Sequence, residues 1–445
     1  MRVLLAVIAA LGIVALACSD GNGGEATPTS TARPEAIPAL RPGLPFAPRL
    51  VPTWVEVPTG APFDRGEYVV DIVSGTRWRI EPTSYPEPGK AATAFLMTWS
   101  PKGEAIVSLE ERVGEESRYS VYVAAPGDPF EPLPHLFQYP VRRLVWSPDG
   151  RFLAGSGGND GAFDRQLRVR DLEQGRVRLE LGGSPHSWSG NSRFLTIINH
   201  SVGRGVGVWD SETYSMPSVN AADFAWSHSG ARLAYIPAPS VWSDQPQEVE
   251  VRVRDFTTGA DMLLTTMPGL PRSPLSWSAD DAFLAMSFIE DPATGRVKTY
   301  IIDVARGAAT VAISGSVSAG WSSRTDTLLF SGNYCGEIDI FTVEADGSNL
   351  RNYTRSKDAD MFPHWSPDGT RVTFISYSSG GAVLALATIP QGEVIDLIPA
   401  APRGTLEPLE AGWSPDSRYI VFTPDSGFGW CEGEEPQTTE VEILP

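Results

Sequence analysis

Residues 142–182 decide the fold and read RRLVWSPDGRFLAGSGGNDGAFDRQLRVRDLEQGRVRLELG. A short apolar run ends at Trp146, and a second one starts at Phe152. Ser147-Pro148-Asp149-Gly150 between them predicts a tight turn, because proline fixes φ and Asp-Gly accepts turn geometry. Residues 167–172 and 176–181 alternate apolar and charged side chains, which is typical of strands. The stretch therefore predicts four antiparallel strands.

The Trp-Ser pair at the centre of this stretch recurs along the chain as an internal repeat. Its tryptophans are Trp99, Trp146, Trp188, Trp226, Trp277, Trp321, Trp365 and Trp413. Spacings of 38 to 51 residues match the length of a four-stranded propeller blade. Because one such sheet cannot bury both faces alone, neighbouring sheets must stack around an axis. We predict an all-β propeller with eight blades of four antiparallel strands, seven blades being the alternative. The tryptophans are expected to pack between blades, ligand stacking being the alternative role.

Both ends of the chain are expected to contribute to the last blade. Residues 67–80, EYVVDIVSGTRWRI, read as outer strands without a Trp-Ser pair of their own. The unit that begins at Trp413 shows a second strand over residues 418–423 and a third over residues 439–444. Joining the N-terminal segment to this unit would close the ring and leave no long edge open.

Two segments near the C-terminus carry a family resemblance. Residues 337–351, EIDIFTVEADGSNLR, and residues 360–374, DMFPHWSPDGTRVTF, resemble the WD40-like PD40 repeat of TolB-type β-propellers. The resemblance covers roughly residues 65–445 and is degraded at Trp188, Trp226, Trp277 and Trp321. It implies a β-propeller. TolB also carries an α/β domain for which this chain has no room, so its envelope partners do not transfer.

The N-terminus, MRVLLAVIAALGIVALAC, predicts export and anchoring. Its apolar stretch is shorter than a membrane span and ends in small residues before Cys18. It resembles a bacterial lipoprotein signal peptide, residues 1–17, with Cys18 as the lipidated residue. Ordinary signal-peptide cleavage and an uncleaved helical anchor are the alternatives. Residues 18–50, rich in Gly, Pro and Thr, predict a disordered tether, and residues 51–445 the propeller. The expected location is extracytoplasmic and lipid-anchored to the cell membrane.

Charge and cysteine content restrict the partners and cross-links. The formal net charge of −19, without a basic stripe, argues against nucleic acid, although an acidic surface could favour cationic partners. Cys335 and Cys431 remain as an even pair for a disulfide, two independent thiols being the alternative. No Cys/His spacing suggests zinc, and we expect a monomer without cofactors.

Catalytic signatures are weak throughout the chain. There is neither a G-x-S-x-G elbow nor an S-x-D-x-G-x-x-W Asp box. His186, His228 and His364 lie near repeat tryptophans, but at unequal offsets, so we expect packing or surface roles rather than a ring of ligands. The loop 159–164 lacks alternating oxygen ligands for Ca²⁺. We therefore expect no catalytic residue and no metal site.

Two functional classes remain open at the level of sequence. The preferred hypothesis is a membrane-tethered, non-catalytic binding module for a protein, peptide or envelope glycan. The alternative is a carbohydrate-active lyase or hydrolase that uses the central channel. Titratable side chains with shifted pKa values clustered at one mouth of the channel would favour the enzyme.

Overall fold

The computed structural model describes most of the chain from residue 51 onward. The described residues are 51–58, 67–83, 90–113, 116–133, 141–157, 166–198, 205–238, 247–291, 295–334, 336–378, 381–401, 406–407, 412–424 and 441–444. Every regular element within these ranges is a β-strand, as the all-β prediction requires. The predicted signal peptide and tether lie outside the described residues.

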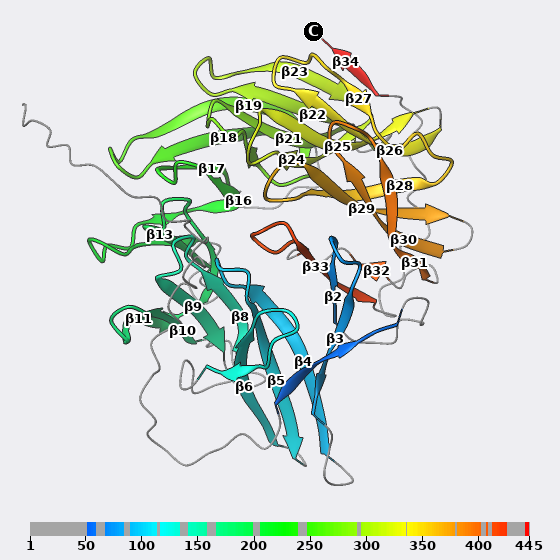
Figure 1. Cartoon of the computed structure of the whole chain (residues 1–445). Coiled ribbons are helices and arrows are strands. Elements are labelled where there is room, and N and C mark those ends of the chain that lie inside the picture. Colours follow the sequence, from blue (N-terminus) through cyan, green and yellow to red (C-terminus); the bar gives the residue numbers. More distant parts are fainter. Residues whose placement is uncertain are drawn as a thin grey trace, which may run out of the picture. The chain divides into compact units, whose positions relative to one another are not determined.

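We number the Trp-Ser repeats 1 to 8, from Trp99 to Trp413, and repeats 1 to 7 each form four consecutive strands (Figure 1). The first strands are β4 (Lys90–Trp99), β8 (Val141–Trp146), β12 (Ser184–Trp188), β16 (Ala221–Trp226), β20 (Ser276–Trp277), β24 (Ser316–Trp321) and β28 (Ala359–Trp365). The second strands are β5 (Ala105–Val113), β9 (Phe152–Gly157), β13 (Phe194–Ile198), β17 (Arg232–Pro237), β21 (Phe283–Asp291), β25 (Thr327–Tyr334) and β29 (Arg371–Ser378). The third strands are β6 (Glu116–Ala124), β10 (Gln166–Asp171), β14 (Val206–Asp210), β18 (Gln247–Asp255), β22 (Arg296–Asp303), β26 (Glu337–Glu344) and β30 (Gly381–Thr388). The fourth strands are β7 (Glu131–Pro132), β11 (Arg176–Gly182), β15 (Ser218–Val219), β19 (Asp261–Pro271), β23 (Ala308–Ser314), β27 (Arg351–Asn352) and β31 (Val394–Ala401).

Repeat 2 confirms the strand reading made from its sequence. Its four strands pair in the order β11-β10-β9-β8, and all pairs are antiparallel. The predicted turn between β8 and β9 closes with the Gly150 N–H donating to the Ser147 carbonyl at 2.9 Å. Gly150 has φ +75°, a conformation that glycine adopts without strain.

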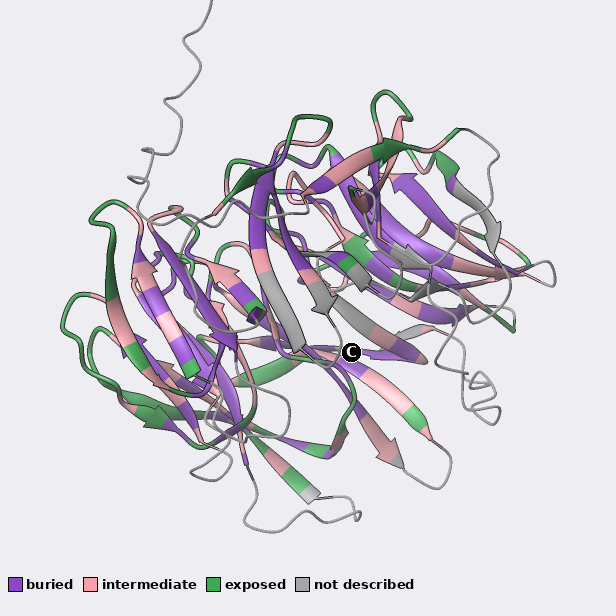
Figure 2. Ribbon diagram, turned by 90° about the horizontal axis from the view of Figure 1, so that it is seen from below, coloured by how far each residue is buried: buried purple, intermediate pink, exposed green. Residues whose placement is uncertain are grey.

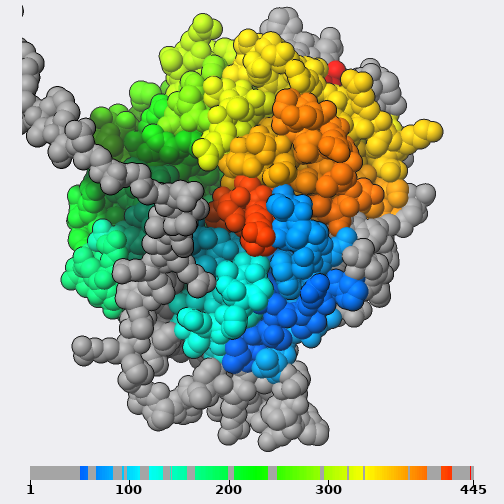
Figure 3. All heavy atoms as spheres, in the orientation of Figure 1, coloured from blue at the N-terminus to red at the C-terminus, as the bar shows by residue number. Residues whose placement is uncertain are grey.

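Repeat 8 is completed by the N-terminal strands, as predicted. Its sheet runs β1-β3-β2-β33-β32, where β1 is Pro52–Glu56, β2 Tyr68–Asp71, β3 Arg77–Pro82, β32 Leu406–Glu407 and β33 Tyr419–Pro424. The first three therefore come from the N-terminus, and β2 pairs with β33 in register Tyr68↔Phe422. In Figure 3 the N-terminal segment, in blue, lies against the orange-red C-terminal segment.

The expectation for residues 439–444 was wrong. The third place in repeat 8 is taken by β2, and the C-terminal strand β34 (Glu442–Leu444) instead pairs with β23 of repeat 5. This pairing adds a strand to the outer edge of repeat 5.

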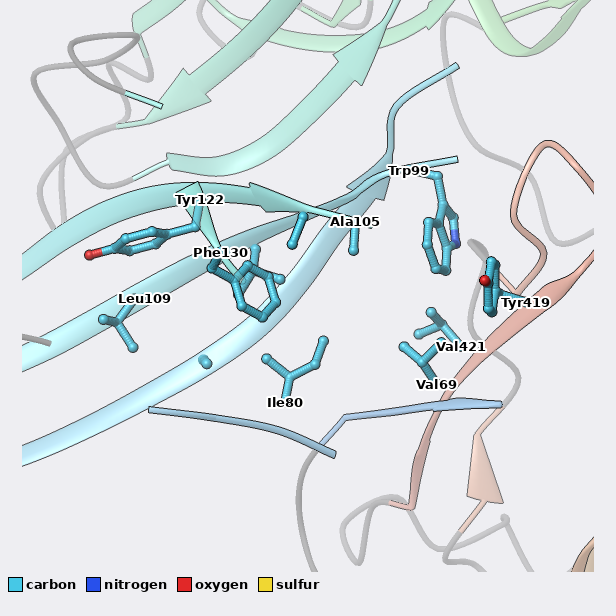
Figure 4. Packing of buried hydrophobic residues seen from close by; sticks show 12 residues of the cluster. Val69, Ile80, Trp99, Ala105, Leu109, Tyr122, Phe130, Tyr419 and Val421 are labelled. Carbon is cyan, nitrogen blue, oxygen red and sulfur yellow. The ribbon is translucent and has the colours of Figure 1, made fainter. Parts of the chain in front are cut away.

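Eight hydrophobic clusters connect the repeats, and each cluster draws its residues from two consecutive repeats. Repeat 8 shares one cluster with repeat 7 and another with repeat 1, so the contacts form a closed cycle. Figure 4 shows the cluster between repeats 8 and 1, where the rings of Trp99 and Tyr419 stack at 6.0 Å. Buried residues run through the strands in Figure 2. The fold is thus a β-propeller; the count of eight blades stays a prediction, which this cycle of contacts favours.

Candidate functional site

The repeat tryptophans all take part in the clusters between neighbouring repeats. Trp99, Trp188, Trp277 and Trp321 are buried, whereas Trp146, Trp226, Trp365 and Trp413 are partly buried. Two indoles also donate to the preceding repeat: Trp188 Nε1 to the Val145 carbonyl at 3.2 Å, and Trp277 Nε1 to the Ala225 carbonyl at 3.0 Å. These positions supply packing between sheets.

The serine of the pair organises the turn that follows it. In repeat 3 the Ser189 hydroxyl donates to Asn191 Oδ1 at 2.7 Å and accepts the Phe194 N–H at 2.9 Å. Repeat 5 repeats this pattern with Ser278, Asp280 and Phe283. The acceptor of the serine hydroxyl lies in the turn, and the N–H donor is the first residue of the second strand. The serine of the Trp-Ser pair therefore stabilises the connection between the first and second strands.

The fourth residue after the tryptophan joins some neighbouring turns. It has a positive φ at Gly103, Gly150, Ser192, Gly230, Asp281, Gly369 and Ser417. At the three positions of this set that are not glycine, the side chain accepts a backbone N–H from the preceding repeat. Ser192 Oγ accepts from Asp149 at 3.0 Å, and Ser417 Oγ accepts from Asp368 at 2.9 Å. Asp281 Oδ2 accepts from Ser229 at 3.0 Å. Sequence reasoning did not identify these links.

Three first strands together form a polar and aromatic surface, which we call the first-strand patch: Arg143, His186 and Phe224. Arg143 Nη2 donates to the His186 carbonyl at 3.5 Å, and the His186 ring lies 4.6 Å from the Phe224 ring. The three residues belong to β8, β12 and β16, so the patch crosses repeats 2, 3 and 4. Arg143 is exposed and the other two are half-buried.

Irregular pairing of these strands positions the patch. The register of β8, β12 and β16 shifts between Val141 and Arg143, between Pro185 and Ser187, and between Ala221 and Asp223. Such bulges re-aim side chains that regular alternation would direct elsewhere. His186 was considered from sequence, but Arg143 and Phe224 were missed. The sequence does contain a signal for these residues, because each lies two or three positions before a repeat tryptophan.

His186 in the patch lies beside two hydroxyl side chains. His186 Nδ1 lies 3.1 Å from Ser187 Oγ, which is also 2.9 Å from Thr196 Oγ1. Burial raises the pKa of neighbouring Asp223 above its usual range, although its carboxylate accepts the Leu275 and Phe224 N–H groups. Asp223 is thus engaged in linking repeats 4 and 5.

A pair of acids, Asp339 and Asp360, lies between repeats 6 and 7. The Ser356 N–H donates to Asp339 Oδ1 at 3.2 Å, and its hydroxyl donates to Asp360 Oδ2 at 3.0 Å. Burial raises the pKa of Asp360, and the Asp339 carboxylate adds to the rise. Both side chains are 1% exposed, so a polymeric substrate cannot reach them.

His228 and His364, which were also considered from the sequence, make contacts of their own. His228 donates its backbone N–H to Asp281, and the His364 carbonyl accepts from Thr373 at 3.5 Å. Cys18, Cys335, Cys431 and the loop 159–164 lie outside the described residues. Among the residues that the structure describes, no group of three or more His, Cys, Asp or Glu could hold a metal. The same residues include no helix long and apolar enough to cross a membrane.

Comparisons with known proteins support the fold and the resemblance. No protein-family model matches the chain. An uncharacterized protein of Agrobacterium fabrum is 26% identical over 249 residues, 55% of this chain and 68% of that protein. A protein of Chlorobium luteolum named as a TolB homolog is 30% identical over 246 residues, 52% of this chain and 54% of that protein. The matched part thus spans about half of the TolB homolog. The dipeptidyl peptidase 4 of Porphyromonas gingivalis is similar in fold, with TM-score 0.50 and 12% identity over 73% of this chain and 55% of that chain.

Proposed function

Because this chain is similar in sequence to a TolB homolog, we propose that it is a non-catalytic module that binds a segment of a partner protein. The first-strand patch carries the proposal. A guanidinium, an imidazole and a phenyl ring there cross three repeats, and Arg and aromatic residues are enriched at protein interfaces. Asp223 and Asp360, whose pKa values burial raises, are both held by hydrogen bonds within the fold.

The module acts outside the cytoplasm and is held at the membrane through Cys18. The support is the N-terminal sequence, whose apolar stretch ends in small residues before Cys18. A Cys18→Ser variant is expected to leave the membrane fraction and to take up no radiolabelled palmitate in a bacterial host. Labelling of the variant equal to that of the wild type would contradict the anchor.

Binding at the patch can be tested with a charge reversal and an aromatic truncation. Arg143→Glu and Phe224→Ala should each reduce capture of the partner from the host envelope by tenfold or more, as expected for central interface residues. The matched controls are Arg306→Glu and Tyr214→Ala, which change an exposed arginine and an exposed tyrosine elsewhere. Both controls should capture the partner as the wild type does.

The outcome also separates binding from catalysis. If all four variants retain capture, the patch is not the binding site. If the wild type degrades an envelope polysaccharide and Phe224→Ala abolishes that turnover, the protein is an enzyme and the proposal fails.

A further inference from the structure

Repeat 5 has an additional strand, β34, beyond its own four strands. Repeats 1, 2, 3, 6 and 7 end at their fourth strand in the described residues, but β23 also pairs with β34. Three residue pairs join these strands antiparallel: Ser314↔Glu442, Ile313↔Ile443 and Ala312↔Leu444. Figure 1 shows β34 in red beside β23. The C-terminal segment thus adds a strand to an existing edge.

The residue before β34 enters a site between repeats 5 and 6. The Val441 N–H donates to the Asn333 carbonyl at 2.9 Å, and its side chain packs against the cluster that contains Phe330 and Ile313. A Cβ at Gly332 would lie 2.4 Å from Val441 Cγ2. Glycine at position 332 therefore makes room for a β-branched side chain. We call this place the Gly332 slot.

The strand is held by few contacts of its own. Its ladder has three residue pairs, and residues 425–440 connect it to β33 in repeat 8. Short terminal elements open with less free energy than the domain as a whole. When β34 leaves, the N–H and C=O groups of β23 become available to another extended chain.

We propose that the β23 edge and the Gly332 slot form an acceptor site for an extended segment of a partner protein. The segment pairs antiparallel with β23 and places valine or isoleucine in the slot, and the C-terminal segment of the chain competes for the same place. Main-chain hydrogen bonds supply affinity in this mode, and the side-chain slot supplies selectivity. This acceptor site shares no residue with the first-strand patch.

A labelled peptide of sequence QTTEVEILP, residues 437–445, tests the site by fluorescence anisotropy. The full chain should bind it at least tenfold more weakly than a chain that ends at Glu440, because the tethered strand has a high effective concentration. Val441→Asp in the full chain should bind the peptide as the shortened chain does. This second variant decides the matter if the shortened chain does not fold.

A substitution at Gly332, with a matched control at another glycine, tests the Gly332 slot separately. Gly332→Val in the Val441→Asp chain should abolish peptide binding, whereas Gly182→Val should not, because a Cβ at Gly182 meets no atom within 4 Å. A peptide with Asp in place of Val441 should not bind. Equal binding by the full chain and the Val441→Asp chain, or binding that survives Gly332→Val, would overturn the proposal.

Discussion

Arg418 donates to the Asp71 carboxylate at 2.7 Å although 347 residues separate the two along the chain. Arg418 lies just before β33 and Asp71 ends β2, so the pair joins the two terminal parts of repeat 8. Arg193 and Asp210 occupy the same places within repeat 3 and are 2.8 Å apart. Repeat 8 therefore holds the chain ends together with the bridge that another repeat uses internally.

Removing this bridge should weaken the closure of repeat 8. Arg418→Met leaves the buried Asp71 carboxylate without its guanidinium partner, so we expect the melting temperature to fall by a few degrees. Thermal unfolding followed by circular dichroism measures the effect. Arg306→Met, at an exposed arginine, serves as control. Identical melting of the two variants would contradict a role in closure.

Asp210 predicts a pH dependence of stability. Burial alone would raise its pKa, but the Arg193 hydrogen bond and the Glu212 and Thr213 donors outweigh burial and lower the pKa to about 2. Because the folded-state pKa lies below the unfolded value, this stability is fully present above about pH 4 and is lost as pH falls toward 2.

Urea unfolding of Asp210→Asn measures this contribution. The variant should lose about 2 kcal/mol of unfolding free energy at pH 7, and its difference from the wild type should shrink at pH 2.5. Asp128→Asn, at an exposed turn residue, should track the wild type at both pH values. A pH-independent deficit in Asp210→Asn would show that the ion pair is not its source.

Two tryptophans at equivalent positions should differ when they are replaced. Trp277→Phe removes a donor to the Ala225 carbonyl and a ring that lies under Arg232, and should cost about 1–3 kcal/mol. Trp365 Nε1 is buried and has no hydrogen-bond partner among the described atoms, so Trp365→Phe should cost less than about 1 kcal/mol. Chemical denaturation compares them, and a larger loss at Trp365 would refute this account.

Alanine substitutions at two glycines should distinguish the cost of backbone strain from the cost of a steric clash between repeats. Gly230 and Gly175 both have positive φ, but a Cβ at Gly230 would lie 2.5 Å from the Asn191 backbone nitrogen, whereas one at Gly175 meets nothing within 4 Å. Gly175→Ala should cost about 1 kcal/mol through strain alone. Gly230→Ala should cost clearly more in the same denaturation assay, and equal costs would rule out the clash.

The disulfide between Cys335 and Cys431 stays a prediction. The Val441 N–H donates to the Asn333 carbonyl at 2.9 Å, and in the sequence Val441 follows Cys431 by ten positions and Asn333 precedes Cys335 by two. Closing a loop of about 100 residues would stabilise the fold by roughly 4–5 kcal/mol in the chain-entropy model. Non-reducing mass spectrometry of the exported protein should find the bond. Two free thiols in the folded protein would exclude it.

The strand order within a repeat was predictable from the sequence because its causes are local. Alternation of apolar and charged residues over 167–171 and the turn at 147–150 act over a few residues, and the structure has β10 and the β8–β9 turn there. The contribution of residues 67–80 to repeat 8 was also predictable, since these residues read as strands without a Trp-Ser pair.

Only the tertiary structure decided which strands pair when they lie far apart in the sequence. Residues 442–444 form a strand, but their sequence does not specify the edge at which they pair, and in the structure they pair with β23 at the edge of repeat 5. The first-strand patch likewise depends on register shifts in three separate strands, which sequence periodicity does not encode. Local patterns specify which segments become strands, whereas the surfaces that meet when the repeats pack specify which residues become neighbours.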